Sequence, residues 1–360
     1  MILILYFVIG MQLFDISTWT EQRWWSTGGT RNKKIYFNPN DNLQYYFKQS
    51  LKKENKDYKY EFWSEIIASE IGLLCGFDVL PYHLAVSGGE VGCLSKSMID
   101  PDKEELVEGG KYIQAFDNTF NPDDRKLRHQ YDFDLIIRML KSFQLERFEK
   151  DIIEFLVFDS LIGNSDRHQE NWAFITEHST LSKSIAEVEF DFNHETLQKI
   201  PNWLRIFVRG YYFSKGKLRP EYNKVKLLMA KSIRFSPIYD SGCSLGRELT
   251  DDRVKQLINN QDLIDAYINK GESEVHWKNK KISHLVLIKH LLNNEELSTM
   301  VRSTIERMVK RFDEAIILEL MNKVDVNLPT ECNSVKIPEE RKQLMSKLVL
   351  SRFNRLKELI

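Results

Sequence analysis

The pattern of hydrophobic and polar positions predicts a strand-rich beginning for this chain. Short aromatic runs at residues 34–38 and 43–48 are separated by an Asn-Pro-Asn-Asp segment, which indicates a β-hairpin. Residues 60–75 repeat apolar positions at helical spacing. A second hairpin is expected where residues 83–86 and 91–99 flank a Ser-Gly-Gly-Glu turn. The first hundred residues are therefore predicted to form strands, one helix and further strands.

The remainder of the chain is predicted to be mainly helical. A short strand, Asn-Trp-Ala-Phe-Ile-Thr, begins at Asn171. The clearest helical segments cover residues 131–143, 147–163, 283–292, 296–321 and 338–358. A run of strands followed by a run of helices is typical of the α+β class. We expect a small β-rich N-lobe over residues 1–99 and a large helical C-lobe over residues 100–360.

Composition limits the partners and the compartment. The 360 residues are 42% hydrophobic, enough to bury a sizeable core. Lysine and arginine number 51 against 52 acidic residues, so the net charge does not indicate a nucleic-acid partner. The four cysteines lie far apart and form no C-x-x-C pair, which argues against a zinc or disulfide framework. They fit a reducing compartment, and we expect a cytoplasmic protein.

The N-terminus begins with nine apolar or aromatic residues. A membrane-spanning helix needs about 20 such residues, so no membrane span is expected here. A signal peptide would have a charged start and a small-residue cleavage site, and neither is present. A buried strand is the favoured interpretation, while secretion and a translation start at Met11 stay open as alternatives.

A polar segment after the predicted helix at residues 147–163 carries groups that phosphoryl transfer needs. That reaction depends on positioning and charge neutralisation, with a carboxylate near the substrate hydroxyl and oxygen ligands for magnesium. Asp166 can serve as general base, and Asn171, five residues later, can offer its amide oxygen to a metal. Taken alone, the segment is more simply explained as a polar turn whose side chains cap the backbone.

A second candidate loop lies downstream at Tyr239-Asp240-Ser241-Gly242. Apolar residues lead into an aspartate that is followed two residues later by glycine, as in the Asp-Phe-Gly metal loop of kinases. Asp240 is predicted to bind the magnesium ion that bridges the phosphates. The alternative is an ordinary Asx turn, which Asp-Ser-Gly sequences commonly form.

Two upstream features complete the set. The segment Ser26–Lys33 contains two adjacent glycines, whose backbone N–H groups can approach an anion closely, although a plain hairpin turn is the alternative. Lys48 ends a predicted strand and is expected on the phosphates. The following helix offers Glu65, or Glu61 one turn earlier, as its ion-pair partner.

These motifs occur in the order found in kinases, on the elements that kinases use. Together, Ser26–Lys33, the Asp166–Asn171 loop and the Tyr239–Gly242 loop resemble the HipA-like serine/threonine kinases, which are bacterial toxin kinases. The resemblance covers about residues 24–245. The Asp-Arg-His-x-x-Asn order also looks like the phosphoinositide-kinase branch of the same superfold. The implied architecture is a two-lobed, protein-kinase-like α+β fold.

The resemblance implies an ATP- and Mg²⁺-dependent serine/threonine protein kinase that phosphorylates itself. Asp166 and Lys48 would be catalytic, and Asn171 and Asp240 would bind the metal. Ser26 would be the autophosphorylation site, with Thr27 and Thr30 as alternatives. The residues expected at ATP, with a hinge at Ser97–Ile99, are Ser26, Thr27, Gly28, Gly29, Thr30, Lys33, Lys48, Glu65, Ser97, Met98, Ile99 and His168.

The resemblance also bears on partners. It implies a protein substrate, translation-related or acidic, and an antitoxin-like partner. The N-terminal region of the longer family members is missing, so we do not assume partner binding through that region. Two other functions stay open: a lipid or small-molecule kinase, and a nucleotide-binding module without catalysis. The latter is disfavoured because a pseudokinase usually lacks at least one of the four groups Lys48, Asp166, Asn171 and Asp240.

The chain departs from the family by an insertion between its two candidate loops. About seventy residues separate Asn171 from Asp240, and the insertion is placed at about residues 178–235. Residues 201–236 hold nine lysines and arginines against one acidic residue, with aromatic residues interleaved. This composition can bind nucleic acid or an acidic partner surface, although a solvated excursion whose aromatics pack on the large lobe is the simpler interpretation.

Overall fold

The computed structural model describes residues 11–22, 33–53, 56–121, 129–184 and 224–360. It contains two compact units, which are described separately. The first comprises residues 1–98, 107–173 and 235–360, and the second comprises residues 99–106 and 174–234. The apolar N-terminus, most of the glycine loop and most of the insertion lie outside the described residues.

The first unit begins with a six-stranded sheet in the order β1-β7-β8-β4-β3-β2. Its strands are β1 (Leu13–Asp15), β2 (Thr20–Glu21), β3 (Lys33–Phe37), β4 (Gln44–Lys48), β7 (His83–Ser87) and β8 (Glu90–Lys96). Strands β1 and β7 are parallel, and the other neighbours are antiparallel. Both predicted hairpins are present. Gly88 and Gly89 have φ values of 56° and 83° in the second turn, a conformation that glycine adopts readily.

Apolar residues on one face of the sheet form its core. They are Ile16, Tyr36, Phe47, Ala85 and Leu94. Phe47, the residue before Lys48, is buried in this core. Its packing therefore fixes the backbone position from which the Lys48 side chain extends. A separate two-stranded sheet follows, made of β5 (Lys52–Lys53) and β6 (Lys56–Asp57).

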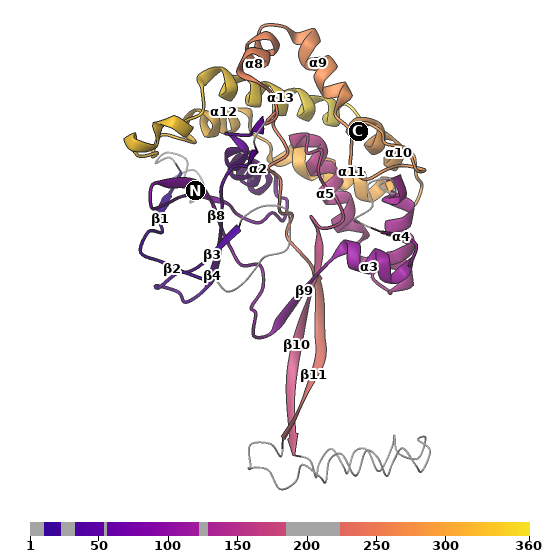
Figure 1. The fold of residues 1–360 in the computed structure, drawn as a ribbon. Helices are drawn as coiled ribbons and strands as arrows, with labels where there is room; N and C mark the ends of the chain where they lie inside the picture. The colour runs from indigo at the N-terminus through magenta and orange to yellow at the C-terminus, as the bar shows by residue number, and fades with distance from the viewer. Residues whose placement is uncertain (1–10, 23–32, 54–55, 122–128, 185–223) are drawn as a thin grey trace. The chain divides into compact units, whose positions relative to one another are not determined.

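Helix α2 (Glu61–Cys75) packs against β8 and against helices α11 (Ser298–Arg311) and α12 (Glu314–Lys323) (Figure 1). It ends at Gly76, whose φ of 81° lets the backbone turn and satisfy the last carbonyl groups. The helix buries its two candidate glutamates together with its apolar residues. Its position between the sheet and the helices brings those carboxylates into the interior.

The rest of the first unit is helical, as predicted. It contains α3 (Gly109–Phe116), α4 (Phe133–Ser142), the 3₁₀ turns η2 (Glu146–Phe148) and η6 (Thr330–Val335), α5 (Glu149–Ile162), α8 (Asp251–Ile258), α9 (Gln261–Lys270), α10 (His284–Leu292) and α13 (Glu339–Lys357). Helix α5 is buried on nearly every side and contacts α10, α11 and α13. A helix that is apolar all round belongs in the core, and α5 is the central helix here.

One predicted helix is two helices in the structure. The periodic segment at residues 296–321 breaks after Arg311, and a second helix starts at Glu314. The Oδ1 atom of Asp313 accepts a hydrogen bond from the N–H group of Ile316 at 3.2 Å, and this side-chain cap starts α12. The apolar spacing continues across the break, which is why the pattern alone indicated one helix.

The second unit consists of a three-stranded sheet in the order β11-β10-β9, in which β9 is Glu104–Glu108, β10 is Ala173–Ser184 and β11 is Lys224–Phe235. Ion pairs link the strands: Lys231 on β11 contacts Glu177 on the neighbouring strand β10 at 2.7 Å, and Arg234 on β11 contacts Glu104 on β9, the other edge strand, at 3.1 Å. The described part of the basic insertion is therefore β-structured, and its exposed lysine and arginine have acidic partners.

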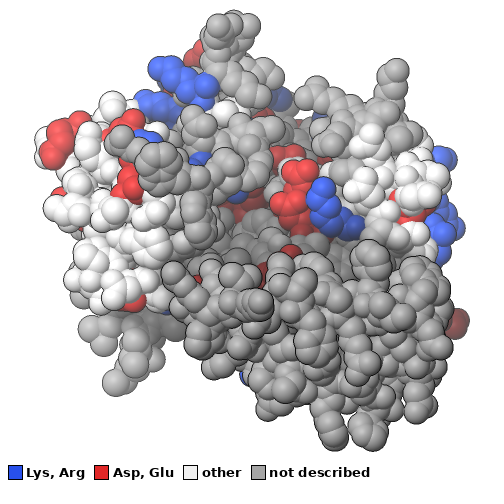
Figure 2. All heavy atoms as spheres, turned by 60° about the horizontal axis from the view of Figure 1, so that its bottom comes forward, with Lys and Arg blue, Asp and Glu red and all other residues white. Residues whose placement is uncertain are grey.

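Charge is mixed over the described residues. The face drawn in Figure 2 carries both acidic and basic side chains, including neighbours of opposite sign near its centre. Within the described residues, no helix is both long enough and apolar enough to cross a bilayer.

Candidate active site

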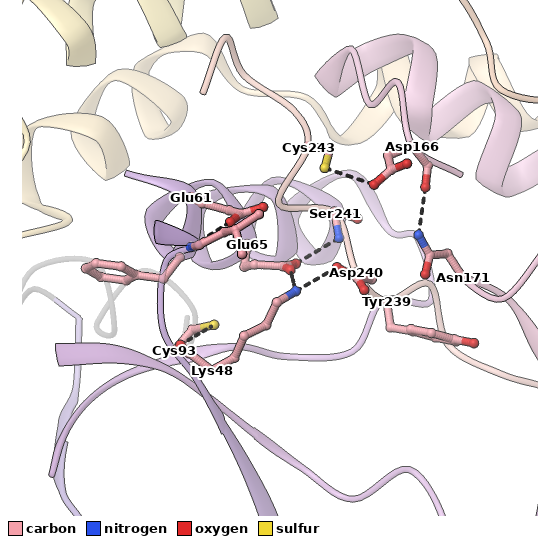
Figure 3. Close-up of polar contacts among 12 residues, drawn as sticks. Lys48, Glu61, Glu65, Cys93, Asp166, Asn171, Tyr239, Asp240, Ser241 and Cys243 are labelled. Carbon is pink, nitrogen blue, oxygen red and sulfur yellow. Dashed lines mark hydrogen bonds and ion pairs between the residues drawn. The ribbon is translucent and has the colours of Figure 1, made fainter. Parts of the chain in front are cut away.

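Lys48 contacts two carboxylates in the interior of the first unit (Figure 3). Its Nζ atom donates to Oε1 of Glu65 on α2 and to Oδ1 of Asp240, the latter at 2.6 Å. The side chain of Lys48 is 5% exposed and that of Glu65 is fully buried, whereas that of Asp240 is 16% exposed. The strand lysine, the helix glutamate and the aspartate of the downstream loop thus form one cluster.

Burial and the Lys48 ammonium act in opposite directions on the ionisation of this cluster. Complete burial raises the pKa of Glu65, and the Lys48 ammonium opposes that shift. One ammonium faces two carboxylates, and buried charges are stable only when they are paired. A metal ion next to Asp240, the most exposed of the three side chains, would add positive charge to this cluster.

The other candidate glutamate, Glu61, makes different contacts. Its Oε2 atom accepts a hydrogen bond from the N–H group of Leu51 at 3.0 Å, and its Oε1 atom lies 3.9 Å from Nη1 of Arg247. Of the two glutamates that the sequence offered, Glu65 is therefore the one in contact with Lys48.

The loop that carries Asp240 is shaped around α2. Asp240 has a φ of 55°, in the left-handed region, and its N–H group donates to the hydroxyl of Tyr82 at 3.3 Å. The next N–H group, of Ser241, donates to Oε2 of Glu65 at 2.8 Å. A Cβ atom on Gly242 would lie only 2.9 Å from Oε1 of Glu65, so this glycine permits the close approach of loop and helix. The Asp240 side chain points at Lys48.

The Asp166 loop follows directly from the end of α5. Asn164 donates to the Asp159 carboxylate at 3.0 Å and accepts the N–H group of Asp166 at 3.3 Å. Nδ2 of Asn171 donates to the carbonyl oxygen of Asp166 at 2.6 Å. Because the amide nitrogen of Asn171 is used in this way, its Oδ1 atom is the group left for a ligand.

Arg167 joins the two loops, and sequence reasoning missed its role. Its guanidinium is 1% exposed and makes two bonds to Asp159, from Nε at 3.0 Å and from Nη2 at 2.9 Å. It also donates to the carbonyl oxygens of Asn171, at 2.9 Å, and Tyr239, and to Oγ of Ser241 at 3.1 Å. Burial lowers the pKa of Arg167, but Asp159, with smaller contributions from Asp240 and Tyr239, raises it above its usual value. The guanidinium therefore fixes the distance between the loops.

The ends of the insertion are closed by direct contacts. The rings of Trp172 and Phe235 are stacked, with centroids 5.8 Å apart and planes 11° apart. The N–H group of Ser236 donates to the carbonyl oxygen of Ala173 at 2.9 Å, and the N–H group of Ala173 donates to Oγ of Ser236 at 3.1 Å. About sixty residues of chain are thus brought back to their starting point, so the insertion leaves the two loops adjacent.

The start of α3 braces the Asp166 loop, which the sequence analysis also missed. The N–H group of Gly109 donates to the carbonyl oxygen of Trp172 at 2.9 Å, and that of Gly110 donates to the carbonyl oxygen of Gln169 at 2.8 Å. A Cβ atom on Gly109 would lie 2.3 Å from the Trp172 ring. The adjacent glycines at residues 109–110 were the available signal, because such pairs often mark a close approach of two backbones.

The remaining predicted residues are placed as follows. Lys33 opens β3 and lies opposite Lys48 in the register of the sheet. Ser97 and Met98 follow β8, and the N–H group of Ser97 donates to the carbonyl oxygen of Gln44 at 2.8 Å. His168 is half-buried, with Nδ1 3.9 Å from the Glu170 carboxylate. Ile99 belongs to the second unit. The loop residues Ser26, Thr27, Gly28, Gly29 and Thr30 lie outside the described residues.

The donor set fits magnesium. Magnesium binds carboxylate and amide oxygens and retains several waters, so one or two protein ligands are enough. Asp240 supplies a partly exposed carboxylate that shares the Lys48 ammonium with Glu65, and Asn171 supplies an amide oxygen. These two residues, linked through Arg167, would hold the ion.

Comparisons with known proteins identify the fold. No family model and no curated protein sequence matches the chain. The crystal structure of the Helicobacter pylori proinflammatory kinase CtkA is similar, with a TM-score of 0.68 and 17% identity over 97% of this chain and 96% of that one. The chain has a kinase-like fold. The predicted α+β architecture, with a curled β-rich part followed by a helical part, is therefore confirmed.

A second solved structure is more distant. The toxin HipA of Shewanella oneidensis MR-1, in a complex with HipB and operator DNA, has a TM-score of 0.45 and 12% identity over 99% of this chain and 70% of that one. The sequence motifs resemble the family that takes its name from HipA.

Proposed function

We propose that the chain is an ATP- and magnesium-dependent serine/threonine protein kinase that also phosphorylates itself. The observation that carries the proposal is the buried contact of Lys48 with Glu65 and Asp240, tied through Arg167 to the loop of Asp166 and Asn171. The kinase-like fold supports it, because these residues lie on the elements that kinases use for phosphoryl transfer.

Each residue has a distinct role in the proposed reaction. Lys48, oriented by Glu65, would bind the phosphates of ATP. Asp166 would accept the proton of the substrate hydroxyl as that oxygen attacks the γ-phosphate. A magnesium ion held by Asn171 and Asp240 would neutralise charge on the phosphates. Arg167 touches neither substrate nor metal in this scheme. It holds the two loops at a fixed distance from each other.

The compartment and the partners follow from the same proposal. None of the four cysteines, all within the described ranges, forms a disulfide, which supports a reducing, cytoplasmic location. A translation-related or acidic protein substrate and an antitoxin-like partner stay predictions. The lobe boundary near residue 99 and the hinge at Ser97–Ile99 also stay predictions.

The decisive experiment is incubation with γ-labelled ATP and magnesium, alone and with cell lysate, for the wild type and Asp166→Asn. We expect label on serine or threonine of protein in the wild type and a loss of about a thousandfold in the variant. Asp252→Asn, at an exposed position in α8, is the matched control and keeps full activity. Label that enters lipid or a small molecule would favour the alternative kinase class. Turnover of Asp166→Asn at the wild-type rate would refute the assignment.

Autophosphorylation is tested separately at the glycine loop. A phosphate on Ser26 adds roughly 1.5 to 2 negative charges, and it would repel ATP phosphates bound to the same loop. We therefore expect phosphate within residues 26–30 after incubation with ATP, and lower activity in the modified protein. Mass spectrometry of the wild type and Ser26→Ala measures the first, and Thr27 and Thr30 are the alternative acceptors.

A further inference from the structure

Asp166 is contacted by a thiol from the neighbouring loop. Cys243, three residues after Asp240, is 6% exposed, and its S–H group donates to Oδ2 of Asp166 at 3.1 Å (Figure 3). Among the described residues, Cys243 is the side chain that donates a hydrogen bond to this carboxylate. The contact occupies Oδ2 and leaves Oδ1 for a substrate hydroxyl.

The thiol is in turn contacted by Arg247. Its Nη2 group donates to the Cys243 sulfur at 2.8 Å. The same guanidinium lies over the Tyr58 ring, 3.9 Å from its centroid, and its Nη1 atom is 3.9 Å from the Glu61 carboxylate at the start of α2. Only 14% of the Arg247 side chain is exposed. Arg247 is therefore held between α2 and the sulfur.

A thiol by itself is a weak hydrogen-bond donor. When its sulfur accepts a charged N–H group, the S–H group becomes more polarised and a better donor to a carboxylate. The contacts run from α2 through Arg247 and Cys243 to Asp166. Because Glu65 on α2 also contacts Lys48, one helix is in contact with the phosphate-binding lysine and, through this chain, with the general base.

We propose that Cys243 and Arg247 are positioning residues, through which the packing of α2 fixes the orientation of the Asp166 carboxylate. The inference rests on the proposed kinase function, since it concerns the base of that reaction. Neither residue touches the phosphates in this scheme, so the effect of changing either falls on turnover and leaves nucleotide affinity alone.

The kinetic test compares Cys243→Ala with Cys243→Ser, which keeps a donor at the same position. The self-phosphorylation rate at saturating ATP falls about ten- to a hundredfold in Cys243→Ala, because a misoriented base costs that much. The Kd of a non-hydrolysable ATP analogue stays within about twofold, and Cys243→Ser recovers to within about threefold of the wild type. Cys332→Ala, which removes another buried thiol, is the control and keeps the wild-type rate. Equal rates for Cys243→Ala and the wild type, or an equal loss in the serine variant, would overturn the proposal.

A double-mutant cycle separates positioning from a general structural role. In an Asp166→Asn background, Cys243→Ala leaves the residual rate unchanged if the thiol acts through Asp166. A further tenfold fall in that background would show that Cys243 supports the fold in some other way.

The contacts themselves are tested without any kinase activity, by the rate at which iodoacetamide alkylates Cys243. The thiolate is the reactive form, so Asp166→Asn raises the rate by about threefold or more and Arg247→Gln lowers it by a similar factor. Alkylation of Cys332 in the same digest is the internal standard. A wild type that transfers no phosphate would refute the proposed function, and opposite shifts in alkylation would still establish the chain of contacts. An alkylation rate that neither variant changes would refute the inference.

Discussion

Two buried ion clusters meet at residues 239–241, and they differ in how completely their charges are balanced. In the Arg167 cluster, one guanidinium faces one carboxylate, Asp159, and its other N–H groups donate to backbone and hydroxyl oxygens. In the Lys48 cluster, one ammonium faces the carboxylates of Glu65 and Asp240. The first has one carboxylate for its cation, while the second has two carboxylates for one cation, and one of the two, Asp240, is partly exposed.

The difference separates structural from chemical roles. A buried ion pair whose hydrogen-bonding groups all have partners is not stabilised further by a ligand. Its role is to fix the geometry of the segments that it joins. An unbalanced cluster near the surface is stabilised by binding a cation and can respond to it. Both clusters touch the same short segment, so the first holds in place the aspartate that the second presents.

The largest effect is expected from breaking the Arg167 cluster. Arg167→Met leaves the Asp159 carboxylate buried without its cation, and removing one partner of such a pair costs about 3–5 kcal/mol. We expect the free energy of unfolding in urea at neutral pH to fall by that amount. Arg253→Met, at an exposed position in α8, is the control and changes it by less than about 0.5 kcal/mol. A loss below about 1 kcal/mol in Arg167→Met would remove the distinction between the clusters.

The next effect concerns the unbalanced cluster. Asp240→Asn removes the partly exposed carboxylate, and we expect the affinity for ATP in the presence of magnesium to fall by about a hundredfold. Without magnesium the affinity changes by less than about threefold, since the lost charge acts through the ion. Calorimetry with and without magnesium measures both values. Asp166→Asn serves as the comparison, because the proposed role of Asp166 as general base does not include holding the nucleotide. Unchanged magnesium dependence in Asp240→Asn would assign that residue to the turn alone.

A smaller effect tests what a buried carboxylate on α2 does without a cation. Burial raises the pKa of Glu70 to about 7, from a usual value of 4.5, and no ion pair involving Glu70 is recorded among the described residues. Between those values the folded state holds a proton that the unfolded state has lost, so stability falls as pH rises from about 4.5 to 7. The loss between pH 5 and pH 8 is on the order of 2 kcal/mol.

Glu70→Gln should remove that pH dependence and stabilise the protein at pH 8 by a similar amount. Thermal or urea unfolding at both pH values measures it. Glu306→Gln, at an exposed position in α11, is the matched control and leaves the pH profile as it is. A Glu70→Gln profile parallel to that of the wild type would contradict the expectation.

Local patterns were sufficient for α2, for both hairpins and for the end of β4. Helical spacing predicted α2 to within one residue, and the two turns identified both hairpins. Lys48 was placed correctly at the end of its strand because aromatic alternation defines β4. The break at residues 312–313 was missed, because a capping aspartate can stand in a periodic segment without disturbing the spacing.

Contacts between distant segments could not be predicted. The role of Arg167 depends on Asp159, and an aspartate inside the apolar helix α5 was the one local sign that a buried cation must lie nearby. The Cys243–Asp166 contact joins residues 77 positions apart and has no local signature. The choice between Glu61 and Glu65 depends on the angle at which α2 meets the sheet, which spacing along one helix does not determine.

The stacked Trp172 and Phe235 rings have a consequence for how this molecule can vary. Because they close the chain on itself beside the two loops, whatever lies between them enters and leaves at one point. Evolution can lengthen, shorten or exchange that excursion while the chemistry beside it stays the same. In protein engineering, residues 174–234 can be replaced at this junction by a short turn or by a foreign binding module.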